Sequence, residues 1–151
     1  MFIQTTRFGR LEIAAQDVLL FPAGIPGLED CREWVLLADA GNDALGWLQS
    51  TTRREIALAA VSPRRFVPGY QIRLARSELA PLELTDVRDA QVLVIVGKSE
   101  FGMTLNLKAP LVINLERRLG RQVMANGDQP VQYVVGAPPP AIERPRLRTA
   151  G

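Results

Sequence analysis

The chain has 151 residues, enough for one domain that buries about two-thirds of its unfolded surface on folding. Its 18 Lys and Arg residues stand against 16 Asp and Glu, and without histidine the net charge is +2, far below that of a dedicated nucleic-acid binder. No segment has the ~20 apolar residues that span a bilayer, and no signal-peptide pattern is present, so we expect a cytoplasmic protein without membrane contact.

Cys31 is the one cysteine of the sequence and cannot form an internal disulfide, which fits a reducing compartment. Two interpretations remain open, a packed structural residue and a reactive thiol. The absence of a histidine that could activate the thiol favours the first.

Short strands are predicted in the N-terminal part of the chain. Residues 2–14 predict a hairpin, and the apolar run 18–21 predicts a third strand. The next seven residues, 22–28, contain two prolines and two glycines and predict an irregular loop. This loop is either a structural turn or an exposed apolar surface, because Ile25 and Leu28 are hard to bury on so short a connection.

Two neighbouring strands, residues 34–38 and 46–50, each carry a tryptophan. Trp34 and Trp47 are flanked by valine and leucine rather than by arginine or lysine, which predicts a shared core and not a base-stacking platform. Residues 56–61 predict a further strand, although their alanines leave a short helical segment open.

A second irregular segment with apolar residues covers residues 62–70. Ser62 can cap a single helical turn with Pro63 at its first position. Residues 70–74 alternate as a strand does. Residues 77–84 predict the one short helix of the chain, although a proline interrupts it.

The central stretch, residues 92–114, predicts strands on both sides of an unusual joint. Residues 92–96 and 111–113 are β-branched apolar runs typical of buried strands. Residues 104–107 alternate polar and apolar, as in a half-buried edge strand, and Pro110 removes one backbone donor where the next strand begins.

The last predicted strands, residues 121–125 and 131–135, flank Asn126-Gly127 and predict a hairpin. Residues 137–151 are rich in proline and arginine and predict a flexible, solvated tail. We therefore predict a mainly β fold: a small antiparallel β-barrel-like single domain over residues 1–136, with one short helix.

The residues that usually carry catalysis or bind metals are scarce. Without histidine there is no Cys/His zinc site and no common general base. The carboxylate pairs Glu29-Asp30 and Asp86 with Asp89 fall in polar loops, where solvated charge is expected. We predict no enzyme, no metal and no cofactor. A small RNA- or oligosaccharide-binding β-barrel is an alternative, suggested by the closed β architecture and the arginines of the tail.

Several segments together, in their order and spacing, resemble the flagellar assembly factor family FliW. The similarity covers roughly residues 2–135. The segments that carry it are Thr5-Thr6-Arg7-Phe8-Gly9, Phe21-Pro22-Ala23-Gly24-Ile25-Pro26-Gly27-Leu28, Trp47-Leu48-Gln49-Ser50, Pro63 through Phe66 to Tyr70, residues 104–114 and Gly120-Arg121-Gln122-Val123.

The resemblance implies a β-barrel-like protein that binds partners. Such proteins bind the RNA-binding translational repressor CsrA and, by an allosteric route, relieve its repression of flagellin mRNA. They also bind flagellin, so the two partners exchange on one factor. The resemblance further implies no direct contact with nucleic acid, and a monomer or weak oligomer.

Partner contacts are expected on the two irregular apolar segments. We hypothesise that Ile25, Leu28, Phe66, Val67 and Tyr70 form one exposed patch, and buried loop anchors are the alternative. Gln71 stands where the resemblance leads us to expect an acidic residue, which would weaken contact with a basic partner. The remaining motif residues are expected to be structural: Gly24, Pro26, Gly27, Thr104, Asn106, Pro110 and Asn114.

Overall fold

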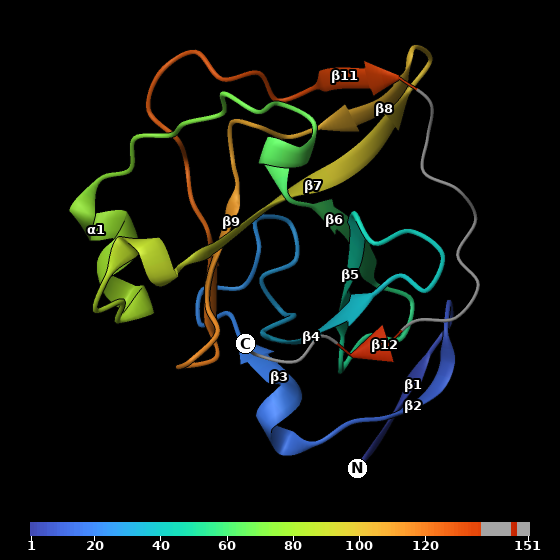
Figure 1. The fold of residues 1–151 in the computed structure, drawn as a ribbon. Coiled ribbons are helices and arrows are strands. Elements are labelled where there is room, and N and C mark those ends of the chain that lie inside the picture. The colour runs from blue at the N-terminus through green and yellow to red at the C-terminus, as the bar shows by residue number, and fades with distance from the viewer. Residues whose placement is uncertain (137–145, 148–151) are drawn as a thin grey trace.

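The apolar runs of the sequence form short strands in the computed structural model, which describes residues 1–136 and 146–147 (Figure 1). Short 3-10 turns and one short helix connect some of these strands. The strands are β1 (Phe2–Thr5), β2 (Gly9–Glu12), β3 (Val18–Leu20), β4 (Glu33–Ala38), β5 (Leu45–Ser50), β6 (Ala57–Val61), β7 (Gln91–Ser99), β8 (Gly102–Leu105), β9 (Leu111–Asn114), β10 (Leu119–Gln122), β11 (Tyr133–Gly136) and β12 (Arg146–Leu147).

The main sheet closes on itself. Neighbouring strands follow the order β7-β6-β5-β4-β3-β10-β9, and β9 pairs with β7 to complete the ring. Every pairing in the ring is antiparallel except that of β10 with β3, which is parallel at Leu119 and Leu20. The predicted barrel is therefore confirmed, as a mixed rather than purely antiparallel one.

The interior of the ring is filled by alternate side chains of β3, β4, β5, β6, β7 and β9. Trp34 and Phe21 are its largest members, and both are fully buried. Their rings pack edge to face, with 6.3 Å between the ring centroids. Gly120 of β10 leaves room for Phe21, because a Cβ atom on Gly120 would lie 2.4 Å from that ring. The continuous apolar runs of these strands thus form the first core.

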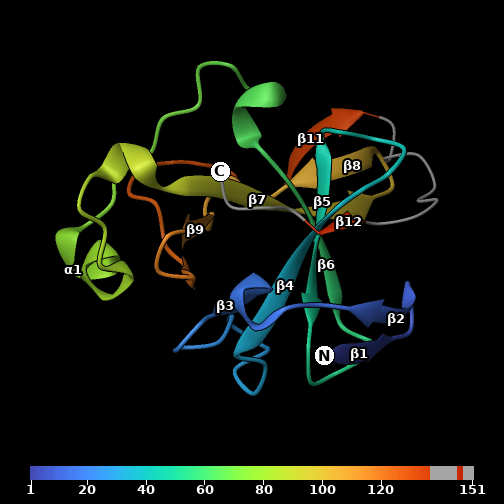
Figure 2. The same cartoon turned by 60° about the horizontal axis from the view of Figure 1, so that its bottom comes forward.

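A second apolar cluster lies on the other face of β4 to β7. Leu37 and Trp47 contribute to it, and the β1–β2 hairpin, β8 and the segment after β6 cover it. The hairpin is fixed to the β5–β6 turn because the Thr6 amide donates to the Arg54 carbonyl at 2.9 Å. Figures 1 and 2 both place this hairpin at the end of the molecule away from α1 (Arg76–Leu79).

The two tryptophans lie in different cores. Trp34 faces the ring interior, whereas Trp47 pairs with Leu37 and faces the second cluster. The predicted shared core is wrong because Trp34 and Leu37 are an odd number of residues apart on one strand and so point to opposite faces. Both are nevertheless buried, with exposed fractions of 0% and 7%.

A lobe of short helical turns connects β6 to β7. It contains η2 (Pro63–Arg65), α1, η3 (Ala80–Leu82) and η4 (Val87–Asp89). Ser62 and Pro63 start η2 as predicted, although the Ser62 side chain forms no capping hydrogen bond. The helix predicted over residues 77–84 is split into α1 and η3. Buried Leu82 anchors the lobe against Val112 and Val123 in a third small cluster.

The predicted strand over residues 70–74 is not formed. A single bridge between Arg73 and Asn126 replaces it, with the Asn126 amide donating to the Arg73 carbonyl at 2.9 Å. This bridge also contradicts the predicted Asn126-Gly127 hairpin. β10 pairs with β9, and β11 pairs with β8, because each finds an apolar ladder partner elsewhere in the sheet. β8 therefore lies between β7 and β11 and is not an edge strand.

β12 belongs to the segment predicted to be a solvated tail. Its two residues pair with Ala38 and Leu37 of β4. β3 covers only Glu33 to Val35, so the rest of that edge of β4 is open to pairing. The prediction is wrong for these two residues, and residues 137–145 and 148–151 lie outside the described part of the chain.

Candidate partner-binding surface

The chain from Phe21 to Cys31, which contains the first irregular segment (residues 22–28), is folded onto the ring interior. Ile25 is only 2% exposed and Leu28 is half-buried, with the Leu28 amide donating to the Ile25 carbonyl at 2.6 Å. Gly24 has a φ of +68°, and its amide donates to the Phe21 carbonyl. The expected exposure of Ile25 is therefore wrong, because the compact turn points this side chain inward.

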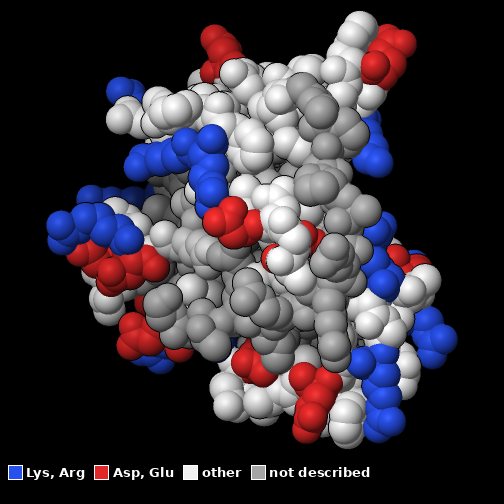
Figure 3. Space-filling view, turned by 45° about the vertical axis from the view of Figure 1, so that its right-hand side comes forward, with Lys and Arg blue, Asp and Glu red and all other residues white. Residues whose placement is uncertain are grey.

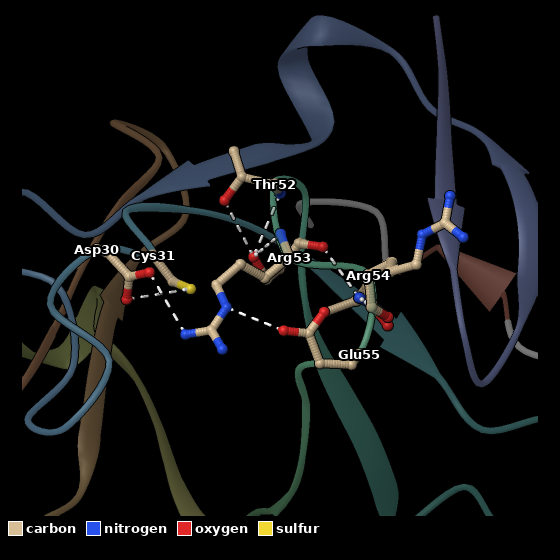
Figure 4. A network of polar contacts seen from close by, with 8 residues as sticks. Asp30, Cys31, Thr52, Arg53, Arg54 and Glu55 are labelled. Carbon is tan, nitrogen blue, oxygen red and sulfur yellow. Dashed lines mark hydrogen bonds and ion pairs between the residues drawn. The ribbon is translucent and has the colours of Figure 1, made fainter.

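A polar network fixes the end of this segment to the β5–β6 turn (Figure 4). Arg53 lies between two carboxylates, at 3.4 Å from Asp30 and 3.0 Å from Glu55. Cys31 is fully buried, and its thiol lies 3.8 Å from the Asp30 carboxylate. A reactive cysteine needs solvent access, which the fully buried Cys31 lacks, so its burial supports the packed structural interpretation.

The second irregular segment covers the cluster around Trp47. Phe66 and Val67 are half-buried against it. Tyr70 is 5% exposed, and its hydroxyl donates to the Leu107 carbonyl at 2.7 Å. Burial raises the pKa of Tyr70 to about 12, so the phenol stays neutral and donates at physiological pH.

The five apolar residues predicted to contact partners do not form one patch. Ile25 and Leu28 pack on the ring interior, whereas Phe66, Val67 and Tyr70 pack on the second cluster. The structure thus contradicts the single exposed patch and places Ile25 and Tyr70 as buried anchors. Gln71 is exposed, with its carbonyl accepting from the Gln129 side chain at 3.2 Å.

Two of the motif asparagines form hydrogen bonds to backbone groups. Asn114 connects β9 to the lobe: its side-chain nitrogen donates to the Leu82 carbonyl at 2.8 Å, and its side-chain oxygen accepts from the Arg117 amide. The Asn106 side chain accepts from the Ala109 amide in its own turn at 3.1 Å. Thr104 and Pro110 are buried, and Pro26 and Gly27 are exposed.

A hollow of about 750 Å³ opens within the lobe, between residues 62–74 and residues 79–90, and Val92 of β7 and Val112 of β9 also line it. We call it the lobe hollow. Most of its lining is aliphatic, and Val87 on its wall is 66% exposed. Its lining residues are Ser62, Pro63, Arg64, Tyr70, Gln71, Ile72, Leu74, Leu79, Leu84, Val87, Arg88, Ala90, Val92 and Val112.

The charged side chains that line the lobe hollow are both arginines. Arg88 pairs with Asp86 at 2.7 Å, and the hydrogen bonds from Arg88 lower the pKa of Asp86 below its ordinary value. Arg64 donates through Nε to the Tyr70 carbonyl at 3.1 Å and forms no ion pair with any residue of 1–136. The rim therefore carries one uncompensated positive charge above an aliphatic floor.

Of the residues that line the lobe hollow, the sequence predicts Tyr70 and Gln71 as partner contacts. It does not predict Leu84, Val87 or Val92 as surface residues of a site. A signal was present, because Val87 is an isolated valine in an otherwise polar loop. Its partners could not be found without knowing where the lobe folds.

Other kinds of site find little support in the described residues. With both tryptophans buried, they form no exposed platform for stacking bases. Over residues 1–136, no group of three or more Cys, Asp and Glu side chains is arranged to hold a metal ion. None of the helices in that range is long and apolar enough to cross a bilayer. On the face shown in Figure 3, basic and acidic side chains are interspersed.

The fold is thus a small closed β-barrel, and the aliphatic lobe hollow is its candidate docking surface. Comparison with known proteins supplies the family. The model of the family described as FliW protein matches residues 2–135. The chain belongs to the FliW family of flagellar assembly factors, and is thus placed among assembly factors rather than enzymes.

Individual relatives agree with this assignment. The chain is 39% identical to the flagellar assembly factor FliW of Bdellovibrio bacteriovorus, over 81% of this chain and 71% of that protein. It is 37% identical to that of an Azoarcus species, over 83% and 92%. A crystal structure of the flagellar assembly factor FliW superposes with a TM-score of 0.83 at 29% identity, covering 90% of this chain and 97% of the other.

Proposed function

We propose that the protein binds CsrA in the cytoplasm, relieving its repression of flagellin mRNA by an allosteric route, and that it also binds flagellin. The observation that carries this proposal is the family match over residues 2–135, which spans the whole barrel and the lobe. In this proposal the protein acts by binding its partners and needs no cofactor.

The two complexes are coupled through a shared factor. If flagellin and CsrA bind the chain with negative coupling, bound flagellin lowers the affinity of the chain for CsrA, and bound CsrA lowers its affinity for flagellin by the same factor. Accumulating flagellin then withdraws the factor from CsrA, and flagellin export returns it.

The most direct test is a pull-down with the tagged full chain from the cytoplasm of the bacterium that encodes it. We expect flagellin and CsrA to be recovered, with flagellin displacing CsrA when added in excess. Recovery of nucleic acid alone, lost at high salt, would instead support the RNA-binding alternative.

A further inference from the structure

We propose that the lobe hollow is the docking site of a flagellin segment that carries one or two apolar side chains next to a carboxylate. This inference rests on the proposed function, because that function supplies the partner. It goes further by stating which residues hold the segment and what chemistry they select.

The shape and lining of the hollow support an apolar side chain as the occupant. Its volume of about 750 Å³ falls in the range of ligand-binding cavities. Val92 and Val112 form its floor, and Leu74 and Leu79 line it as well. Val87 is largely exposed at its wall, so a docked side chain would remove apolar surface from water there.

The rim charge supports a carboxylate beside that apolar side chain. Arg64 projects from η2 with only its Nε hydrogen-bonded, which leaves the terminal nitrogens of the guanidinium free for bidentate pairing with a carboxylate. Arg88 adds a second guanidinium, already compensated by Asp86. Within residues 1–136, no acidic side chain lines the hollow.

The same charge argues against CsrA at this position. A protein that binds RNA presents basic surface to the phosphates, and an arginine rim would repel such a surface. Of the two proposed partners, flagellin is therefore the one assigned to the lobe hollow, and CsrA must contact the factor elsewhere.

The test is calorimetric titration of the full-length chain with purified flagellin and, separately, with purified CsrA from the same bacterium. Two substitutions probe the hollow, Arg64→Glu for the charge and Val87→Asp for the apolar wall. Each has a matched control. Arg65→Glu changes the neighbouring arginine of η2, which pairs with Asp43 at 3.4 Å and does not line the hollow. Phe101→Asp changes an exposed apolar residue between β7 and β8.

We expect Arg64→Glu and Val87→Asp each to weaken flagellin binding at least tenfold, with CsrA binding and both controls within twofold of the unchanged chain. Equal flagellin affinity in all four variants would overturn the docking site while leaving the proposed function standing. Parallel losses for flagellin and CsrA would overturn the assignment of the hollow to flagellin. A chain that binds neither protein would refute the proposed function and this inference with it.

Discussion

Single buried polar groups hold the surface segments of this protein in place. Tyr70 and Asn114 each reach across a long sequence separation to a backbone carbonyl, at Leu107 and at Leu82. Both carbonyls sit where no strand ladder could satisfy them, so the side chains replace missing backbone donors. The first contact holds Tyr70, which lines the lobe hollow, and the second ties the lobe to β9.

The buried phenol of Tyr70 makes stability depend on alkaline pH. In the unfolded chain Tyr70 ionises near its ordinary pKa of 10.0, whereas the folded chain keeps the proton up to about 12. The stability from this group is complete below pH 10 and falls as the pH rises toward 12. Tyr70→Phe should be roughly 1–3 kcal/mol less stable at pH 8, because the Leu107 carbonyl loses its donor.

Urea unfolding at a series of pH values measures this effect. The unchanged chain and Tyr70→Phe should converge between pH 10 and 12, and Tyr133→Phe, which alters an exposed ring, should follow the unchanged chain. Parallel curves for the unchanged chain and Tyr70→Phe across that range would show that the phenol does not stay protonated in the folded state.

Asn114→Ala should loosen the lobe. It leaves the Leu82 carbonyl unpaired, which should cost roughly 1–3 kcal/mol of the free energy of unfolding. Hydrogen exchange should accelerate over residues 76–90 and change little in β4 and β5. Asn106→Ala is the matched control, since it removes one hydrogen bond within its own turn. Unchanged exchange over the lobe in Asn114→Ala would contradict the role given to this side chain.

Among the elements, the loop before β4 packs into the core through Ile25 and Cys31. Gly24 allows this conformation, since a Cβ atom there would lie 2.6 Å from the Glu29 Cα. Gly27 also has a positive φ, of +87°, but no atom of the described part of the chain lies within 4 Å of its Cβ position. An alanine at position 27 would therefore suffer backbone strain alone, whereas an alanine at position 24 would suffer backbone strain and steric overlap.

Replacing each glycine with alanine tests this difference. Gly27→Ala should cost about 1–2 kcal/mol from the left-handed conformation alone. Gly24→Ala should cost about 1–3 kcal/mol more, because the added methyl overlaps the backbone of Glu29. Thermal unfolding of the two variants measures the gap. Equal melting temperatures would mean that the turn shifts freely and is not part of the core.

A strand could be predicted where its local sequence pattern was sufficient. It could not be predicted where its formation depended on which distant strand it pairs with. The runs 92–96 and 111–113 became β7 and β9, because short β-branched runs next to turn residues favour strands over helices. Asn126-Gly127 looked like a hairpin turn, yet β11 pairs with β8, which lies far earlier in the chain. Alternation at residues 70–74 was also insufficient, because only Arg73 finds a bridge partner.

For the whole molecule, the barrel was predictable from the strand pattern, but the surface was not. The short loop around Ile25 suggested exposure, but the structure buries Ile25 in the same apolar cluster as Trp34 and Cys31. The lobe hollow is lined by residues between 62 and 92 and by Val112. These segments come together because β7 pairs with β9 at Val92 and Val112, where the ring closes.

We propose that this barrel binds flagellin or CsrA, one at a time. Calorimetric titration of flagellin into the purified chain, alone and saturated with CsrA, measures whether the two complexes exclude each other. We predict tight binding to the free chain and an affinity lowered at least tenfold by CsrA. Failure of flagellin to bind the free chain, or equal affinity with and without CsrA, would contradict the account.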